Sequence, residues 1–361
     1  MNRREFLATA AATAVVTTGR TGLAAEPSSA LERVIEESHF SGTVLITGGS
    51  ETLLHRGFGE ADRSFAVPCG QDTRYRIASI TKLFTATMVL QLVQEKKLDL
   101  DKTIGTYLPR YAGGGRDKST VRQLLHHTSG IENFDHGLTS FEQAARSGMP
   151  AYQMPHTSDE LLTQFASGPL VQEPGAAFDY NNADFVILGK ILEAVEGASF
   201  DRLLQQRIVG PLKLQATGLF PARLIQKNLS STYYADEGQS LGNDLPVYPE
   251  NWYAAGGMIS SASDLLVFSG GLFGGRLLSP EGLRTMLAPG LEDYGCGLWI
   301  ATLEVKGKKH RFGQRPGRIM GANTLLLQFL DDPLNIILLG NTNVADTDKL
   351  GFALARQILA G

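Results

Sequence analysis

The chain has 361 residues, 43% of them hydrophobic, so it can bury one large core or a core shared by two lobes. Its formal net charge of −4 gives no indication of a strongly basic protein that binds nucleic acid or an anionic membrane surface. We therefore expect an ordinary globular protein with no nucleic-acid partner.

The N-terminus differs from the rest of the chain. The stretch MNRREFLATAAATAVVTTGRTGLAA places Arg3 and Arg4 before an alanine-rich run that ends in small residues, as an export signal does. The RREFL stretch resembles a twin-arginine signal. The apolar run from Phe6 to Val16 is too short to cross a bilayer of about 30 Å. We expect residues 1–25 to be an export signal, and the mature protein to be periplasmic or secreted without a stable membrane span.

Three elements are predicted after the signal. Apolar residues at helical spacing predict a helix within residues 28–40. Two β-favouring runs, residues 43–47 and 52–58, flank a Gly-Gly-Ser turn and predict a hairpin. A helical pattern then extends from Ser79 to Leu98.

The C-terminal part returns to strands. After amphipathic helices and polar loops, strand-like runs cover residues 296–305, 322–330 and 334–341, and a last helix follows. Strands at both ends with helices between them predict an α/β fold of the α+β type, with one antiparallel sheet built from both termini. We expect a sheet lobe (26–75 and 255–361), an inserted helical lobe (76–254), and a site in the cleft between them.

The stretch RIASITKLFT places Ser79 and Lys82 on one face of the predicted helix. A serine hydroxyl needs a base to become nucleophilic, and burial among apolar residues lowers the pKa of a lysine, which makes a neutral amine accessible. The alternative is a serine helix cap beside a lysine that extends to solvent. Taken alone, the spacing does not decide between them.

A second group of polar residues lies in FDYNNADFVILGK, where Tyr180 and Asn182 precede an apolar helix. A tyrosine near a lysine cation is drawn toward phenolate and can share proton transfer, and an asparagine amide can donate to a substrate carbonyl. The alternative is a half-buried loop tyrosine followed by a turn asparagine.

The two groups occur together with TVRQLLHHTSGI, AAGGMISSASDLLVF and YGCGLW, in an order and spacing that resemble the serine β-lactamase and penicillin-binding protein superfamily. The branch it resembles contains class C β-lactamases, D-alanyl-D-alanine carboxypeptidases, D-aminopeptidases and related esterases. The resemblance covers about residues 38 to 345, and implies that residues 26–361 form a serine hydrolase domain.

The resemblance also implies roles for individual residues. Ser79 and Lys82 match the S-x-x-K motif, as acylated nucleophile and proton partner. Tyr180 and Asn182 match Y-x-N, as general base and substrate-contacting amide. The third motif, usually K-T-G or H-x-G, aligns with Arg315, Pro316 and Gly317 in FGQRPGRIMGAN.

The altered third motif bears on the substrate. Arg315 can hold a substrate carboxylate bidentately, whereas Pro316 lacks the hydroxyl of a threonine. Gly317 would let substrate approach the backbone closely. Because residues two apart share a strand edge, the N–H of Arg318 is expected to form an oxyanion hole with that of Ser79.

We therefore expect an acyl-enzyme hydrolase that cleaves an amide, lactam or ester, as a D-alanyl peptidase or an esterase. The alternatives are a true β-lactamase and a non-catalytic, penicillin-binding sensory member of the same fold. The expected partner is a small-molecule or peptide substrate, such as a cell-wall peptide or a β-lactam. No cofactor is expected, because GGLFGG lacks the lysine and the strand-to-helix setting of a phosphate loop.

Two further features are interpreted as structural. His126 and His127 match a turn after a helix in the family, which we favour over a metal or catalytic role. Cys69 and Cys296 form no metal site. An exported protein could join them, but they are far apart in sequence and are as well explained as separate buried thiols.

Overall fold

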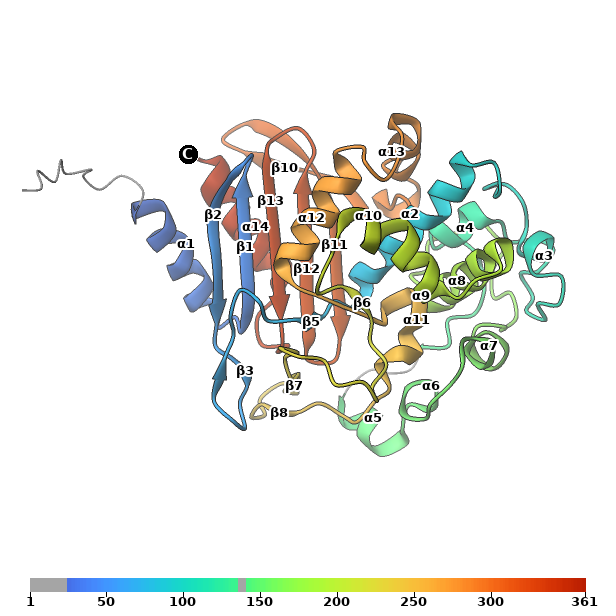
Figure 1. Ribbon diagram of the computed structural model, residues 1–361, viewed down its shortest axis with the longest axis horizontal. Coiled ribbons are helices and arrows are strands. Elements are labelled where there is room, and N and C mark those ends of the chain that lie inside the picture. Colours follow the sequence, from blue (N-terminus) through green and yellow to red (C-terminus); the bar gives the residue numbers. More distant parts are fainter. Residues whose placement is uncertain (1–24, 136–140) are drawn as a thin grey trace, which may run out of the picture.

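The computed structural model describes residues 25–135 and 141–361. The expected export signal therefore lies outside the described residues, apart from Ala25. At the centre is a six-stranded antiparallel sheet in the order β10-β11-β12-β13-β1-β2 (Figure 1). Its strands are β1 (Gly42–Gly48), β2 (Glu51–Phe58), β10 (Trp299–Val305), β11 (Lys308–Ile319), β12 (Ala322–Phe329) and β13 (Leu334–Gly340).

Both ends of the chain build this sheet. Strand β1 lies between β2 and β13, with Gly42 opposite Gly340 and Gly48 opposite Leu334. The predicted fold class is confirmed, including the pairing of N- and C-terminal strands. The predicted hairpin is also present, with a register shift between Ile46 and Thr47.

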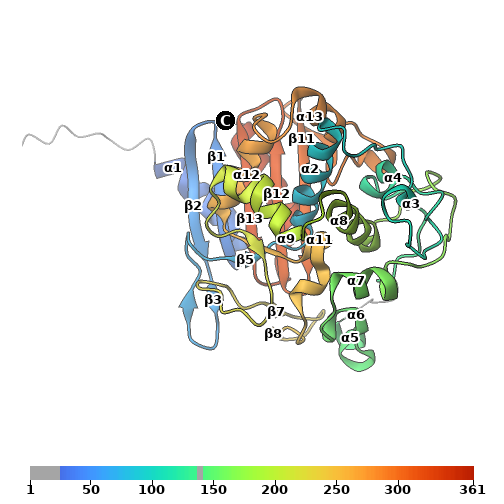
Figure 2. The same cartoon turned by 45° about the vertical axis from the view of Figure 1, so that its right-hand side comes forward.

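The sheet separates two layers of helices (Figures 1 and 2). On one face, α1 (Ala25–Glu37) and α14 (Thr347–Leu359) pack together over a core that includes Leu325 and Leu338. On the other face, a larger core joins Leu326 and Ile337 of the sheet to the apolar residues of α2 (Thr81–Gln94) and α8 (Asn182–Glu196). Alternating residues of one strand thus face different cores, as the twofold period of a strand requires.

The remaining helices lie mostly on the side of α2. They are α3 (Ile104–Tyr107), α4 (Val121–Leu125), α5 (Phe141–Ser147), α6 (Pro150–Gln153), α7 (Ser158–Glu160), α9 (Phe200–Leu204), α10 (Gly210–Leu212), α11 (Tyr253–Gly256), α12 (Ala262–Phe273) and α13 (Pro280–Met286). Short 3₁₀ helices are η1 (Ala78–Ile80), η4 (Pro249–Trp252) and η5 (Leu291–Asp293), and π-helical turns are η2 (Leu161–Phe165) and η3 (Gln205–Val209).

Three small sheets complete the fold. They are β3 (Glu60–Asp62) with β4 (Val67–Pro68), β5 (Tyr75–Arg76) with β9 (Met258–Ser260) and β6 (Gly218–Leu219), and β7 (Tyr233–Tyr234) with β8 (Gly242–Asn243). The three-stranded sheet joins two segments at the borders of the expected helical lobe, β5 and β9, to β6 inside that lobe. It leads the chain into η1 and so helps to place the first motif.

The end of helix α2 and the start of strand β10 differ from the predicted residues. Helix α2 ends at Gln94 rather than Leu98, because Lys96 takes a left-handed φ of 57° that closes the helix. Strand β10 begins at Trp299 rather than Cys296, because Gly297, with φ 86°, turns the chain just before it. No helix in the described ranges combines the length and the apolar character needed to cross a membrane.

Candidate active site

Ser79 lies in η1, which runs directly into the buried helix α2. The preceding residue, Ala78, has a φ of 48°, a left-handed conformation that costs a non-glycine residue free energy and is typical of residues that hold a functional group in place. Helix α2 is apolar around most of its surface and buries eleven residues from Thr81 to Leu92. The serine is therefore presented from a rigid element in the core.

Lys82 is fully buried one turn after Ser79. Its Nζ donates to Ser79 Oγ at 3.3 Å, Asn182 Oδ1 at 2.6 Å and the carbonyl of Ala255 at 3.0 Å. Burial lowers the pKa of Lys82 to about 8, with a further lowering by the Arg315 charge and an opposing effect of Tyr180. A neutral amine is thus accessible near neutral pH, as predicted from its apolar neighbours.

Tyr180 reaches the same hydroxyl from the loop before α8. Its phenol lies 2.8 Å from Ser79 Oγ and donates to it. Burial alone would raise the pKa of Tyr180, but the charges of Arg315 and Lys82 outweigh it and lower the pKa to about 8. Ser79 Oγ therefore lies between an amine and a phenol that both exchange protons near the same pH.

Arg315, on β11, is 1% exposed and completes this centre. Nε donates to the carbonyl of Ser79 at 2.7 Å, Nη1 donates to Tyr294 OH at 2.8 Å, and Nη2 donates to Tyr180 OH. Its guanidinium carbon also lies 5.4 Å from the ring centroid of Trp299. Arg315, which the alignment assigned to the third motif, thus lies beside Ser79 and Tyr180, and all three of its side-chain nitrogens donate to protein atoms.

Asn182, the first residue of α8, connects Lys82 to a carboxylate. Its Oδ1 accepts from Lys82, and its Nδ2 donates to Asp135 Oδ2 at 2.6 Å. Tyr152 OH also donates to this carboxylate, at 2.7 Å from Oδ1. Sequence analysis missed Asp135, Tyr152 and Tyr294. Only Tyr294 had a signal, since it begins the YGCGLW stretch.

Gly317 brings β11 close to η1. A Cβ at this position would lie 2.5 Å from the carbonyl oxygen of Ile77 and 3.0 Å from the amide nitrogen of Ser79. We expected close approach by substrate, and the structure instead shows close approach by the protein's own backbone. A side chain at residue 317 would push the strand away from Ser79.

Arg318 lies in the C-terminal part of β11, where the strand pairs with a neighbouring strand on one side only. Pairing with β10 ends at Gln314, whereas pairing with β12 continues to Ile319 and sets Pro316 opposite Leu325. The Arg318 side chain is exposed and forms an ion pair with Asp348 at 2.5 Å. The role of the Arg318 backbone N–H in an oxyanion hole stays a prediction.

The features interpreted as structural are also placed. His127 is fully buried, and Cys69 and Cys296 are both free and buried. Within the described ranges, no group of three or more His, Cys, Asp or Glu side chains is arranged to hold a metal ion.

A family model described as Beta-lactamase matches residues 28–354. The chain belongs to the Beta-lactamase family. Protein Rv1367c of Mycobacterium tuberculosis (strain ATCC 25618 / H37Rv) is 30% identical over 335 residues, which cover 84% of this chain and 79% of that protein. The superfamily predicted from the motifs is thus confirmed, while the branch that contains class C β-lactamases is not singled out.

Two solved structures resemble the structure of this chain. A penicillin-binding protein from Bacillus halodurans has a TM-score of 0.79 and 25% identity, with 91% of this chain and 99% of that chain covered. A D-stereospecific amidohydrolase from Streptomyces sp. has a TM-score of 0.75 and 29% identity, with 92% and 98% covered. The family and these neighbours support a hydrolase.

Proposed function

We propose that this member of the Beta-lactamase family is a serine hydrolase that forms a covalent acyl-enzyme on Ser79. The observation that carries the proposal is the position of the Ser79 hydroxyl, 3.3 Å from the Lys82 amine and 2.8 Å from the Tyr180 phenol. Both groups have a pKa of about 8, so the pair can take the serine proton and later return it.

The proposed reaction has two stages. Ser79 Oγ attacks the substrate carbonyl carbon while its proton passes to the Lys82–Tyr180 pair, and the N–H groups of Ser79 and Arg318 hold the oxyanion. The pair then protonates the leaving group, and water releases the acyl group from Ser79. Asn182 contacts the substrate in this scheme.

Arg315 supports a choice among substrates. Its guanidinium is 1% exposed and uses three of its five N–H groups to donate to Ser79 O, Tyr294 OH and Tyr180 OH, so little of it is left for a substrate carboxylate. We therefore assign Arg315 to holding Tyr180 and propose an ester or an uncharged amide as substrate, ahead of a D-alanyl carboxypeptide or a β-lactam. The similarity to a D-stereospecific amidohydrolase agrees with amide cleavage.

Mass spectrometry after a fluorophosphonate or penicillin challenge tests this function. We expect one adduct, located on Ser79, in the wild-type protein and none in Ser79→Ala. A p-nitrophenyl ester, a chromogenic cephalosporin and a D-alanyl-D-alanine peptide then distinguish esterase, β-lactamase and carboxypeptidase activity. An Ser79→Ala protein that still cleaved the ester at the native rate would exclude the mechanism, and a stable adduct without turnover would favour the sensory alternative.

We also propose that the protein is exported, on the basis of Arg3, Arg4 and the alanine-rich run that follows them. Fractionation of cells that express the full chain, compared with an Arg3→Lys, Arg4→Lys double variant, tests this. Retention of the wild-type chain in the cytoplasm would contradict the proposal.

A further inference from the structure

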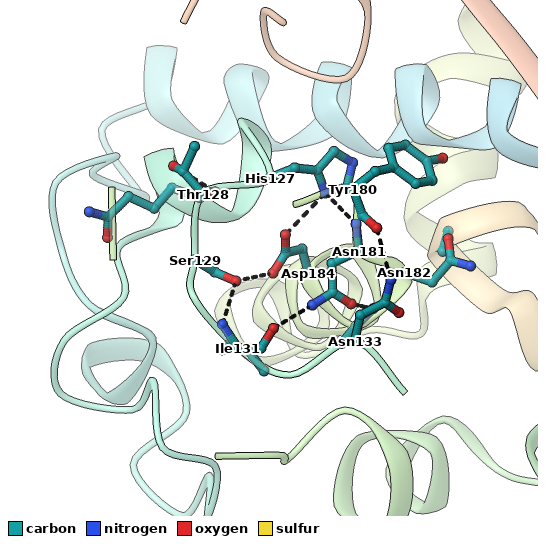
Figure 3. Close-up of polar contacts among 12 residues, drawn as sticks. His127, Thr128, Ser129, Ile131, Asn133, Tyr180, Asn181, Asn182 and Asp184 are labelled. Carbon is teal, nitrogen blue, oxygen red and sulfur yellow. Dashed lines mark hydrogen bonds and ion pairs between the residues drawn. The ribbon is translucent and has the colours of Figure 1, made fainter. Parts of the chain in front are cut away.

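The loop after α4, residues 126–133 with the sequence HHTSGIEN, holds the segment that carries Tyr180 (Figure 3). Two hydrogen bonds involve His127: Asp179 N–H donates to its carbonyl at 2.8 Å, and Asn181 N–H donates to its Nδ1 at 3.2 Å. Two more link the rest of the loop to this segment: Asn133 Nδ2 donates to Tyr180 O at 2.9 Å, and Asn181 Nδ2 donates to Ile131 O at 2.8 Å. Polar backbone groups on both sides of the Tyr180 side chain are thus fixed by one loop.

His127 has an unusual backbone for this purpose. Its φ of 55° is left-handed, a conformation that is uncommon for a residue other than glycine. The two adjacent histidines serve different partners, since His126 Nδ1 contacts the carbonyl of Tyr294 at 3.0 Å while His127 contacts Asn181. Left-handed residues that persist in a core are often held there for function.

The hydrogen bonds define where the protons lie. Asn181 N–H points at His127 Nδ1 from 3.2 Å, which assigns the proton of a neutral imidazole to Nε2, a buried atom with no hydrogen-bond partner among the described residues. Asp184 Oδ2 lies 3.0 Å from the same Nδ1, and with this tautomer the contact is a hydrogen bond if Oδ2 carries the proton of a neutral carboxyl. The other oxygen, Oδ1, accepts from Ser129 Oγ at 2.5 Å.

The surroundings agree with two neutral groups. His127 and Asp184 are both fully buried. Burial, together with the charges of Lys82 and Arg315, keeps the pKa of His127 well below its usual value, and burial raises the pKa of Asp184 well above its usual value. The ring of His127 also packs on that of Tyr180, with centroids 4.5 Å apart.

We propose that His127 and Asp184 form a neutral buried pair that positions Tyr180 for proton transfer with Ser79. They are positioning residues, because they act through the 179–181 backbone and the Tyr180 ring. The inference deepens the proposed function and rests on it. It predicts that the positioning of Tyr180 requires residue 184 to donate to His127 and to accept from Ser129. A negative charge at residue 184 is not required.

The test compares Asp184→Asn with Asp184→Leu, using hydrolysis of a p-nitrophenyl ester. An asparagine amide can donate to His127 Nδ1 and accept from Ser129, so we expect kcat within about threefold of wild type. Leucine removes both bonds at similar volume. We expect kcat about 10²-fold lower with KM changed by less than about twofold, because Tyr180 is displaced from Ser79.

The pH profile separates positioning from stability. The charged or titratable groups that face Tyr180 are Lys82 on α2, Arg315 on β11, Tyr294 before β10 and His127 itself. When the phenol leaves Arg315 and Lys82, its pKa returns toward the normal value, so the pH midpoint of kcat should rise in Asp184→Leu.

A matched control is Ser119→Ala, which removes a buried hydroxyl that donates to Ser129 O at 2.7 Å in the same loop. It should lower the melting temperature without moving the pH midpoint. Equal impairment of Asp184→Asn and Asp184→Leu would overturn the neutral pair. An Asp184→Leu protein with a lower melting temperature but with the wild-type kcat and pH midpoint would overturn the positioning role.

If Asp184→Leu does not fold, His127→Asn and His127→Gln provide the same comparison. Asparagine can place an acceptor near the position of Nδ1, whereas glutamine extends toward that of Nε2. We expect activity to persist in the first and to fall in the second, and the reverse order would overturn the proposal. Absence of any Ser79 adduct in the wild-type protein would instead reject the proposed function.

Discussion

Arg315 places a guanidinium beside both Ser79 and Tyr180. Guanidinium groups remain charged in proteins, whereas a buried lysine can lose its proton. Since Arg315 donates to Tyr180 OH and also lies over its ring, with 5.3 Å from the guanidinium carbon to the centroid, its charge stabilises the phenolate continuously. The pH dependence of the enzyme should therefore reflect Lys82 and Tyr180 alone.

The corresponding prediction concerns the pH profile of kcat/KM. Both members of the Lys82–Tyr180 pair have lowered pKa values of about 8, and the proton-accepting form accumulates above that value. We expect the rate to rise with pH, with a midpoint near 8, and then to stay level. A rate that falls between pH 7 and 9 in a protein that remains folded would contradict this assignment.

Replacing Arg315 by lysine tests its role. Lysine cannot contact Ser79 O, Tyr294 OH and Tyr180 OH at once, so we expect kcat/KM to fall about 10- to 100-fold and the midpoint to rise. Steady-state kinetics from pH 6 to 10 measure both. If Arg315 instead anchored a substrate carboxylate, only KM for carboxylate-bearing substrates would change, and the midpoint would stay near its wild-type value.

At the scale of elements, the site depends on the contact between β11 and η1. Thr324 of β12 supports this contact, since its hydroxyl donates to the carbonyl of Ile77 at 3.1 Å. Gly317 allows it, because no side chain separates the strand from the backbone of Ile77 and Ser79. Ser79 and residues 315–317 of β11 are thus held together by main-chain contacts as well as by the Arg315 side chain.

Gly317→Ala should disrupt this contact. The added Cβ would lie 2.5 Å from the Ile77 carbonyl oxygen, so the strand has to move, and overpacking of this kind costs about 1–3 kcal/mol of unfolding free energy. We expect a lower melting temperature and loss of Ser79 labelling. The control is Gly270→Ala in α12, where a Cβ meets no atom within 4 Å, and which should be neutral or stabilising by up to about 1 kcal/mol.

The elements also show how far sequence reasoning extends. Hydrophobic period and turn residues predicted the hairpin and the C-terminal strands, because these properties are local. The motif resemblance predicted that Ser79, Lys82, Tyr180 and Arg315 belong together. Their hydrogen bonds were not predictable, because no local pattern shows which way a guanidinium points. Asp135 and Tyr152 were missed for the same reason, since only the folded chain brings Asp135 to Asn182 and Tyr152 to Asp135.

At the scale of the whole molecule, the two expected lobes share one core. The cluster that contains Leu45, Leu326 and Ile337 of the sheet also contains Phe84 of α2 and Leu188 of α8. The residues of the candidate site come from the helices and from the sheet around this cluster, with Tyr180 before α8 and Arg315 on β11. A site assembled in this way requires that the lobes keep a fixed relation, which a continuous core provides.

We therefore expect the lobes to unfold together. Calorimetry and near-ultraviolet circular dichroism of the chain without residues 1–25 should give one transition at one temperature. Ile337→Ala, in the fully buried centre of β13, should cost about 2–5 kcal/mol of unfolding free energy and lower that single transition, since Ile337 packs in the core common to both lobes. Two resolved transitions, with only one shifted by Ile337→Ala, would show that the lobes are separate folding units and that the site lies at a mobile interface.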